Sequence, residues 1–319
     1  MIPPLSVLDL TPVRQGGDAG QAIADTIALA RRADELGFHR YWLVEHHNTP
    51  GVAGSATAVL IAHLAAHTKR IRIGAGGVML PNHAPLVVAE QFGTLEALHP
   101  GRIDLGVGRG LNNDAATLAA LRRLPGHMER FPDDVRELLF FLDDARPDQA
   151  VRAVPGQGSH VPVWILGTGL GGAVLAAELG LPFAFGSHFA PDHMEMAIAA
   201  YRARFRPSAR WKEPHLMLSL TVVAAPTDAE ARFHFSSVQQ AHDGPLPPPV
   251  AGYESTLPPQ RLALLKSRLR HALVGTPEKI ARGLADFTAR FQPDEILAVT
   301  QLFDPAARRT SLELLAAAA

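Results

Sequence analysis

The sequence Arg40-Tyr41-Trp42-Leu43-Val44-Glu45-His46-His47-Asn48 turns from apolar to polar within a single residue step. Its apolar part, residues 41–44, is flanked by helical patterns, and a run of this kind predicts a buried parallel strand. The carboxylate and the two imidazoles of Glu45-His46-His47 then lie at the carboxyl end of that strand. Because ligands bind at this end in α/β folds, these residues predict both the fold class and the place of the functional site.

Seven further apolar runs predict strands, and helical patterns separate them. The runs are residues 5–10, 70–80, 102–108, 161–166, 182–186, 215–225 and 295–300. Two of the helical patterns cover residues 53–68 and 261–273. Eight β/α units in succession fit one barrel of ~250 residues with insertions. The sequence therefore predicts an α/β fold in which a single (β/α)8 TIM barrel with insertions spans residues 1–319 as one domain.

Composition excludes several classes of protein. With 47% hydrophobic and 19% charged residues, the chain can bury a large core and is not intrinsically disordered. A formal net charge of -1 indicates neither nucleic acid nor an anionic membrane as a partner. The absence of cysteine removes disulfides, thiolate nucleophiles and cysteine-bound metals. No export signal and no membrane-spanning run of ~18–20 apolar residues is visible, so a cytoplasmic location is expected.

In a closed barrel the residues after all strands meet at one mouth. The residues expected there are Asp9, Glu45-His46-His47, Gly76-Gly77, Arg109, Gly167-Thr168-Gly169 and Ser187-His188. The segment Gly167-Thr168-Gly169-Leu170-Gly171-Gly172 precedes a helix, whose amino end offers free N–H groups to a phosphate. Its glycines let the backbone approach that phosphate closely. Arg109, after the neighbouring strand, would add a charged donor, so we expect a phosphorylated and mostly planar cofactor.

The same glycine-rich segment fits a dinucleotide fingerprint, with Gly167, Gly169 and Gly172 at the required spacing. A nucleotide-binding unit of that type needs an acidic residue at the end of the next strand, where this chain has Ser187-His188. Four β/α units also precede the segment, whereas the fingerprint usually opens its domain. An NAD(P)-dependent oxidoreductase is therefore the second choice.

Glu45, His46 and His47 allow two kinds of chemistry. Successive strand residues face opposite sides, so His46 and His47 do not readily bind one metal ion, whereas Glu45 and His47 share a face. His83 or Asp9 would complete a facial triad of metal ligands with them. Because no HxH or HxxxH pair accompanies carboxylates at the predicted strand ends, proton transfer by histidine is preferred and no metal is expected.

Several motifs together resemble those of the bacterial luciferase-like flavin monooxygenases, and the similarity runs along almost the whole chain. It is closest to the subgroup described as luciferase-like oxidoreductases. The motifs are Glu45-His46-His47, Gly74-Ala75-Gly76-Gly77-Val78-Met79-Leu80-Pro81, Gly101-Arg102, Gly108-Arg109-Gly110-Leu111, Gly180-Leu181-Pro182 and Gly275-Thr276-Pro277-Glu278. Together they are specific for the family, and they do not specify a substrate.

The resemblance implies a barrel that binds FMN, usually as a homodimer, and that takes reduced FMN from a separate flavin reductase. Reduced FMN would react with O2 to give a C4a-peroxyflavin, which oxidises a small organic substrate. By analogy, His46 matches the catalytic histidine and Glu45 matches a carboxylate that organises the site. His47 would help Glu45 to orient His46.

The resemblance also assigns residues to the cofactor. Gly76-Gly77 match a non-proline cis peptide beneath the flavin ring. The phosphate would be held by Arg109, Gly167, Thr168, Gly169 and Gly172, with Arg130 as a second cation. This chain departs from the family in having glycine at 169 and 172, where hydroxyl side chains are frequent. It also continues after Arg109 with Gly110-Leu111-Asn112-Asn113-Asp114 instead of Ala-Pro-Gly-Thr-Asp.

Three rival functions remain for the same barrel: a deazaflavin (F420) reductase, a flavin-binding barrel without activity, and a metal-dependent hydrolase. Residues 244–259 are rich in proline and too long for an ordinary connection, so they are a candidate lid. The alanine-rich helical pattern of residues 53–68 is expected to lie in a dimer interface.

Overall fold

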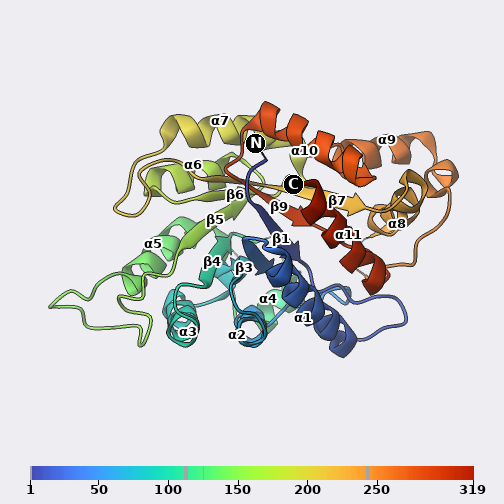
Figure 1. The fold of residues 1–319 in the computed structure, drawn as a ribbon. Coiled ribbons are helices and arrows are strands. Elements are labelled where there is room, and N and C mark those ends of the chain that lie inside the picture. Colours follow the sequence, from blue (N-terminus) through green and yellow to red (C-terminus); the bar gives the residue numbers. More distant parts are fainter. Residues whose placement is uncertain (1, 111–113, 125, 242–243) are drawn as a thin grey trace.

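The computed structural model describes residues 2–110, 114–124, 126–241 and 244–319. In this part of the chain, parallel strands close into a barrel surrounded by helices, which confirms the predicted (β/α)8 architecture (Figure 1). The barrel strands, in order around the ring, are β1 (Leu5–Asp9), β2 (Arg40–Leu43), β3 (Arg72–Met79), β4 (Ile103–Gly108), β5 (Val163–Gly167), β6 (Phe183–Phe185), β7 (Leu216–Ala224) and β9 (Glu295–Val299). Pairing of β9 with both β1 and β7 closes the ring.

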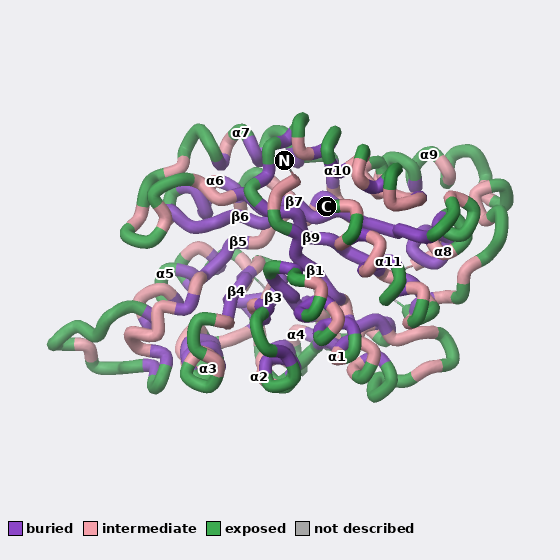
Figure 2. The backbone as a smooth tube through the Cα atoms, viewed as in Figure 1, coloured by how far each residue is buried: buried purple, intermediate pink, exposed green. Residues whose placement is uncertain are grey.

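The helices cover the outside of the barrel, and exposed residues lie on the helices and loops whereas the barrel strands are buried (Figure 2). They are α1 (Ala19–Leu36), α2 (Thr57–His67), α3 (Pro85–Leu98), α4 (Ala115–Ala120), α5 (Phe131–Leu142), α6 (Leu170–Leu179), α7 (Met194–Arg204), α8 (Asp228–Gln240), α9 (Pro259–Arg268), α10 (Pro277–Phe291) and α11 (Pro305–Ala318). Local sequence sets their ends. In α1, for example, the side chain of Asp18 accepts a hydrogen bond from the Gln21 N–H, and Gly37 ends the helix in the left-handed conformation.

Side chains fill the inside of the barrel, so it is a packed core and not a pore. We call this set the interior cluster; its members are Leu8, Trp42, Val44, Trp164, Ala184, Met217, Leu297 and Val299. The rings of Trp42 and Trp164 meet edge to face, with their centroids 5.2 Å apart. Leu10 and Leu166 pack against the cluster and are partly exposed. The cluster therefore presents an apolar surface toward the mouth.

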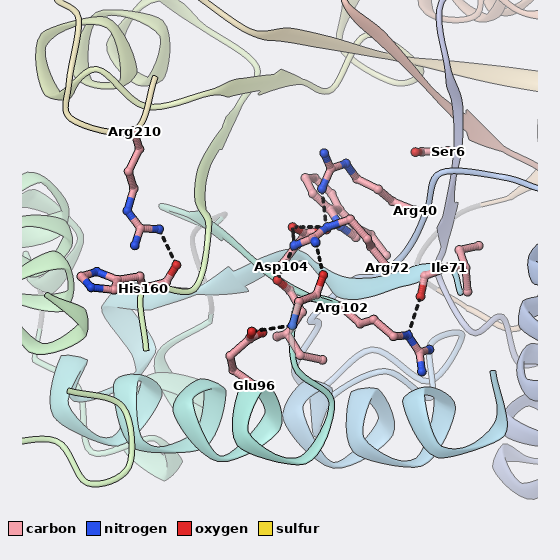
Figure 3. Close-up of polar contacts among 12 residues, drawn as sticks. Ser6, Arg40, Ile71, Arg72, Glu96, Arg102, Asp104, His160 and Arg210 are labelled. Carbon is pink, nitrogen blue, oxygen red and sulfur yellow. Dashed lines mark hydrogen bonds and ion pairs between the residues drawn. The ribbon is translucent and has the colours of Figure 1, made fainter. Parts of the chain in front are cut away.

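A buried ion network closes the opposite end of the barrel, where the strands begin (Figure 3). Arg40 donates from Nη1 to Asp104 Oδ2 at 2.7 Å and from Nε to Glu295 Oε1 at 3.0 Å. Arg72 donates to the other oxygen of Asp104 at 2.7 Å. Burial lowers the pKa of Arg40, but the charges of Asp104 and Glu295 prevail and raise it, so the guanidinium stays charged. Because this end of a barrel carries stability and not chemistry, we assign the network a structural role.

The predicted helix over residues 261–273 is wrong at its carboxyl end. Helix α9 stops at Arg268, and Leu273 begins a short strand, β8 (Leu273–Gly275). The last residues of β7 extend beyond the barrel, and Val222 pairs there with Leu273. Pairing with an unpaired strand edge can make a short segment adopt a strand even where its sequence has helical spacing. The helix predicted from residue 53 likewise begins later, at Thr57. No helix among the described residues is both long and apolar enough to cross a membrane.

The proline-rich segment 244–259 is tied to the barrel at two points. Leu246 is buried, and its N–H donates to the carbonyl of Val13 at 2.7 Å. The N–H of Val250 donates to Ser236 Oγ on α8 at 2.7 Å. The segment also contains a short helix, η4 (Tyr253–Thr256). It therefore lies against the loop after β1 and against α8, and its role as a lid stays a prediction.

Candidate functional site

Glu45 is the centre of a hydrogen-bonded cluster at the barrel mouth. Its side chain is buried and lies just beyond β2. Its Oε1 lies 2.9 Å from His47 Nε2 and 2.8 Å from His83 Nε2. An ionised carboxylate only accepts hydrogen bonds, so both Nε2 atoms carry a hydrogen and donate it to Glu45. Glu45 and His47 therefore meet, as expected from their shared face, and His83 joins them.

The surroundings of this cluster fix its charge. Burial raises the pKa of Glu45, but the hydrogen bonds and charges of His47 and His83 prevail and hold it below its usual value. The hydrogen bond to Glu45 raises the pKa of His47, against the opposing effect of burial. Glu45 thus stays ionised at neutral pH, and His47 holds a proton more readily than an isolated histidine. The arrangement can store a proton beside His46.

Replacing Glu45 with glutamine should lower the pKa of His47. The substitution removes the negative charge that favours the imidazolium and leaves the effect of burial, which favours the neutral ring. Histidine titration by NMR in the protein without cofactor measures the shift. Glu35→Gln, which changes an exposed carboxylate paired with Arg32 on α1, is the matched control and should leave His47 unchanged. A His47 pKa equal to that of the wild type in the Glu45 variant would contradict the assigned contact.

His83 was not among the predicted site residues, although the sequence offered it as a third ligand. It follows a short helix, η1 (Leu80–Asn82), which continues directly from β3. Since β2 and β3 pair side by side, a polar residue shortly after β3 lies close to one after β2. Strand adjacency was the signal that could have assigned His83 to the site.

The donor atoms of Glu45, His47 and His83 lie within 4.8 Å of one another, so the three could also surround a cation. In the structure these atoms are hydrogen-bonded to one another directly, and the Glu45 oxygen already has two donors. The direct contacts satisfy the carboxylate without an ion. That this site binds no metal stays a prediction.

Asp9 does not contribute its side chain to the mouth, and this expectation is wrong. The carboxylate is completely buried and accepts hydrogen bonds from Thr26 on α1 at 2.8 Å and from Arg308 on α11 at 2.6 Å. Tyr41 is a further donor. Asp9 follows Leu8, which points into the barrel, so Asp9 points outward to the helices. Its role is to join β1 to the helical layer.

The Gly76-Gly77 pair forms part of the barrel wall near the mouth. Its peptide bond is cis, as the resemblance implies. A Cβ at Gly76 would lie 2.6 Å from Leu8 Cδ1, and one at Gly77 would lie 2.7 Å from the carbonyl oxygen of Gly106. Packing against backbone therefore requires glycine at Gly77, whereas a side chain at Gly76 would have to displace Leu8, and the backbone of β3 is without side chains there.

The glycine-rich segment forms an open cradle at the amino end of α6. Gly169 is the N-cap of this helix, and no side chain caps it. A Cβ at Gly169 or Gly171 would meet no atom within 4 Å, so the space above the first turn is free. Gly167 and Gly172, by contrast, pack closely against each other. Half-buried Thr168 completes the segment. Free N–H groups facing open space fit the oxygens of a phosphate.

Arg109 lies beside this cradle. It follows β4 directly, and Gly108 pairs with Leu166 of β5, so Arg109 and Gly167 extend from neighbouring strand ends. Its side chain is exposed, and no residue among the described ones forms an ion pair with it. A charged donor next to a helix amino end is suited to a phosphate dianion. The predicted phosphate residues thus come together.

Among the described residues, no contact joins Arg130 to the cradle. It ends a short helix, η2 (His127–Arg130), is exposed, and lies 3.9 Å from Asp134. Its role as a second cation stays a prediction. The departure from the family at Leu111-Asn112-Asn113 lies outside the described residues.

Comparison with known proteins connects this site to a family. The family model for luciferase-like monooxygenases matches residues 4–292. A luciferase-like monooxygenase of Escherichia coli is 47% identical over 97% of this chain and 95% of its own. An N-acetyl-S-alkylcysteine monooxygenase of Bacillus subtilis is 32% identical over 98% of this chain and 96% of its own. The crystal structure of apo-MsnO8, 35% identical, superposes with a TM-score of 0.91 over 99% of this chain and 98% of that one. This chain therefore belongs to the luciferase-like monooxygenase family.

Proposed function

We propose that this protein is a flavin-dependent monooxygenase that uses reduced FMN and O2 to oxidise a small organic substrate. The observation that carries the proposal is the presence of two complementary parts at one barrel mouth. One is the open anion cradle of α6 with Arg109. The other is the cluster around Glu45. A separate reductase would supply the reduced flavin, and a homodimer is the expected assembly.

The residues of the cradle fit the phosphate end of the cofactor. Arg109 would pair with the phosphate, and the N–H groups at the start of α6 would bind its remaining oxygens. The bare backbone at Gly76-Gly77 would let a flat ring approach the barrel wall. When bound, reduced flavin supplies the electrons that activate O2.

The cluster around Glu45 would manage protons. His46 is proposed as the general acid and base for the oxygen atoms that react. The hydroxyl of Ser55 donates to the backbone carbonyl of His46 at 2.8 Å, which fixes the backbone at this residue. His47 and His83 hold the carboxylate of Glu45 in place. The apolar interior cluster below the mouth limits the entry of water, which would otherwise compete with the substrate.

Arg109→Ala should weaken binding of FMN by about 10- to 100-fold and leave binding of riboflavin nearly unchanged. The guanidinium has its predicted contact only with the phosphate, which riboflavin lacks. Fluorescence titration of the two flavins gives both dissociation constants. Arg282→Ala, which removes an exposed arginine from the outer helix α10, is the control. Equal losses for FMN and riboflavin would show that Arg109 does not bind the phosphate.

Anaerobic titration with reduced FMN, followed by admission of O2, tests the function itself. We expect saturable binding of reduced FMN and O2 consumption that depends on it. Failure to bind reduced FMN would overturn the proposal. Hydride transfer with F420 and no consumption of O2 would support the deazaflavin rival instead.

A further inference from the structure

His188 and Ser219 form a hydrogen-bonded pair at the mouth that the proposed chemistry does not use. His188 lies three residues beyond β6, and Ser219 is a buried residue of β7. His188 Nδ1 lies 2.7 Å from Ser219 Oγ. The backbone N–H of His188 also points to this oxygen, at 3.3 Å. The imidazole is therefore attached to β7 through a single hydroxyl group.

The hydrogen bonds of Ser219 favour one tautomer of His188. A serine hydroxyl has one hydrogen, and that of Ser219 is donated to the carbonyl of Phe185 at 3.0 Å. With its hydrogen on that carbonyl, the Ser219 oxygen accepts from the backbone N–H and from Nδ1 of His188, and we infer that Nδ1 carries the hydrogen and Nε2 the lone pair. No residue among the described ones donates to Nε2. Burial lowers the pKa of His188 to about 4, which keeps the ring neutral at physiological pH.

The strand pattern places the hydroxyl that holds His188 on the inner face of the barrel. Ser219 and Met217 are two residues apart on β7 and share a face, and Met217 belongs to the interior cluster. The hydroxyl that holds His188 therefore points inward. Around the ring, β6 and β2 are four strands apart in either direction, so they are opposite each other. His188 thus lies across the mouth from Glu45 and its neighbours.

We propose that His188 Nε2 binds the organic substrate by accepting a hydrogen bond. The preferred substrate would be small and largely apolar, with one hydroxyl or amide N–H group. Its apolar part would contact the upper surface of the interior cluster, at Leu10, Val44 and Leu166. Its donor group would hold it at the wall opposite the proton-transfer cluster. The identity of this ligand as a substrate rests on the proposed function, whereas the hydrogen bond itself does not.

Histidine NMR on 15N-labelled protein without cofactor tests the tautomer and the binding together. Long-range 15N–1H correlations should show His188 as the neutral Nδ1–H form from pH 6 to 8. Cyclohexanol, which has a donor, should bind about 3- to 10-fold more tightly than methoxycyclohexane, which has none, and should shift the Nε2 resonance. An Nε2–H tautomer, equal affinities, or a His188 signal that responds only to FMN would overturn the inference.

Variants separate this role from a structural one. His188→Met should abolish the preference for cyclohexanol, and His188→Gln should keep part of it because its amide oxygen can accept. Ser219→Ala keeps the imidazole and frees its tautomer, so it should weaken the preference even if His188→Met fails to fold. A preference retained in all three variants would contradict the proposal. Since these measurements need neither flavin nor turnover, a preference for cyclohexanol in a protein that fails to bind reduced FMN would refute the proposed function alone.

Discussion

Replacing His46 with alanine is expected to lower the rate of substrate oxidation by about 10²- to 10⁴-fold while FMN remains bound. The imidazole follows β2 at the mouth and is the proposed group that transfers protons during oxygen activation. Without it, proton transfer depends on water, and more of the consumed O2 should appear as H2O2. Oxygen uptake, product formation and peroxide release, measured together, determine both the rate and the coupling.

The control for this prediction is His99→Ala. His99 lies between α3 and β4, at the end of the barrel where the strands begin, and its loss should change neither rate nor coupling. Titration of each variant with FMN shows whether the binding site is intact. Full oxidation rates in the His46 variant would remove this residue from the mechanism, whatever the behaviour of Glu45.

Replacing Asp104 with alanine is expected to lower the free energy of unfolding by about 3–5 kcal/mol. Asp104 is completely buried, and it pairs with Arg40 at 2.7 Å and with Arg72 at 2.7 Å. It also accepts a hydrogen bond from the indole of Trp42 at 3.3 Å. The substitution leaves Arg40 buried with only one of its two carboxylates. Urea unfolding followed by circular dichroism measures the loss.

An exposed ion pair provides the contrast. Asp133 and Arg136 on α5 are 2.9 Å apart, a similar distance, but their side chains are 78% and 51% exposed. Because solvent screens such a pair, Asp133→Ala should change stability by no more than about 0.5 kcal/mol. Similar losses in the two variants would show that burial of the network at the base of the barrel has no special energetic weight.

Most of the barrel could be predicted because its elements have local causes. The helices Pro85–Leu98 and Pro277–Phe291 begin at a proline and carry apolar residues at helical spacing, and both features can be read from the sequence. The glycine-rich segment could be placed before a helix for the same reason. Strand β8 could not be predicted, because its three residues form a strand only where the edge of β7 is free to pair with them.

The directions in which side chains point at the barrel mouth could not be predicted from the sequence either. Asp9 and Glu45 both follow apolar runs, yet one carboxylate faces the helices and the other faces His47 and His83. The partner of Asp9 is Arg308, which is 299 residues away in the chain. Such contacts depend on which strands become neighbours and on where each pairing ends.

The sequence by itself determined the order of the eight barrel strands, the carboxylate and imidazoles of Glu45-His46-His47 after the second of them, and the glycines at the start of α6. These follow from side-chain periodicity and from backbone freedom, which are properties of short segments. The tertiary structure alone decided that His83 shares the carboxylate of Glu45 and that His188 is hydrogen-bonded to Ser219. A hydrogen bond has direction and a range of about 3 Å. Only the closed barrel brings residues from separate strands within that range.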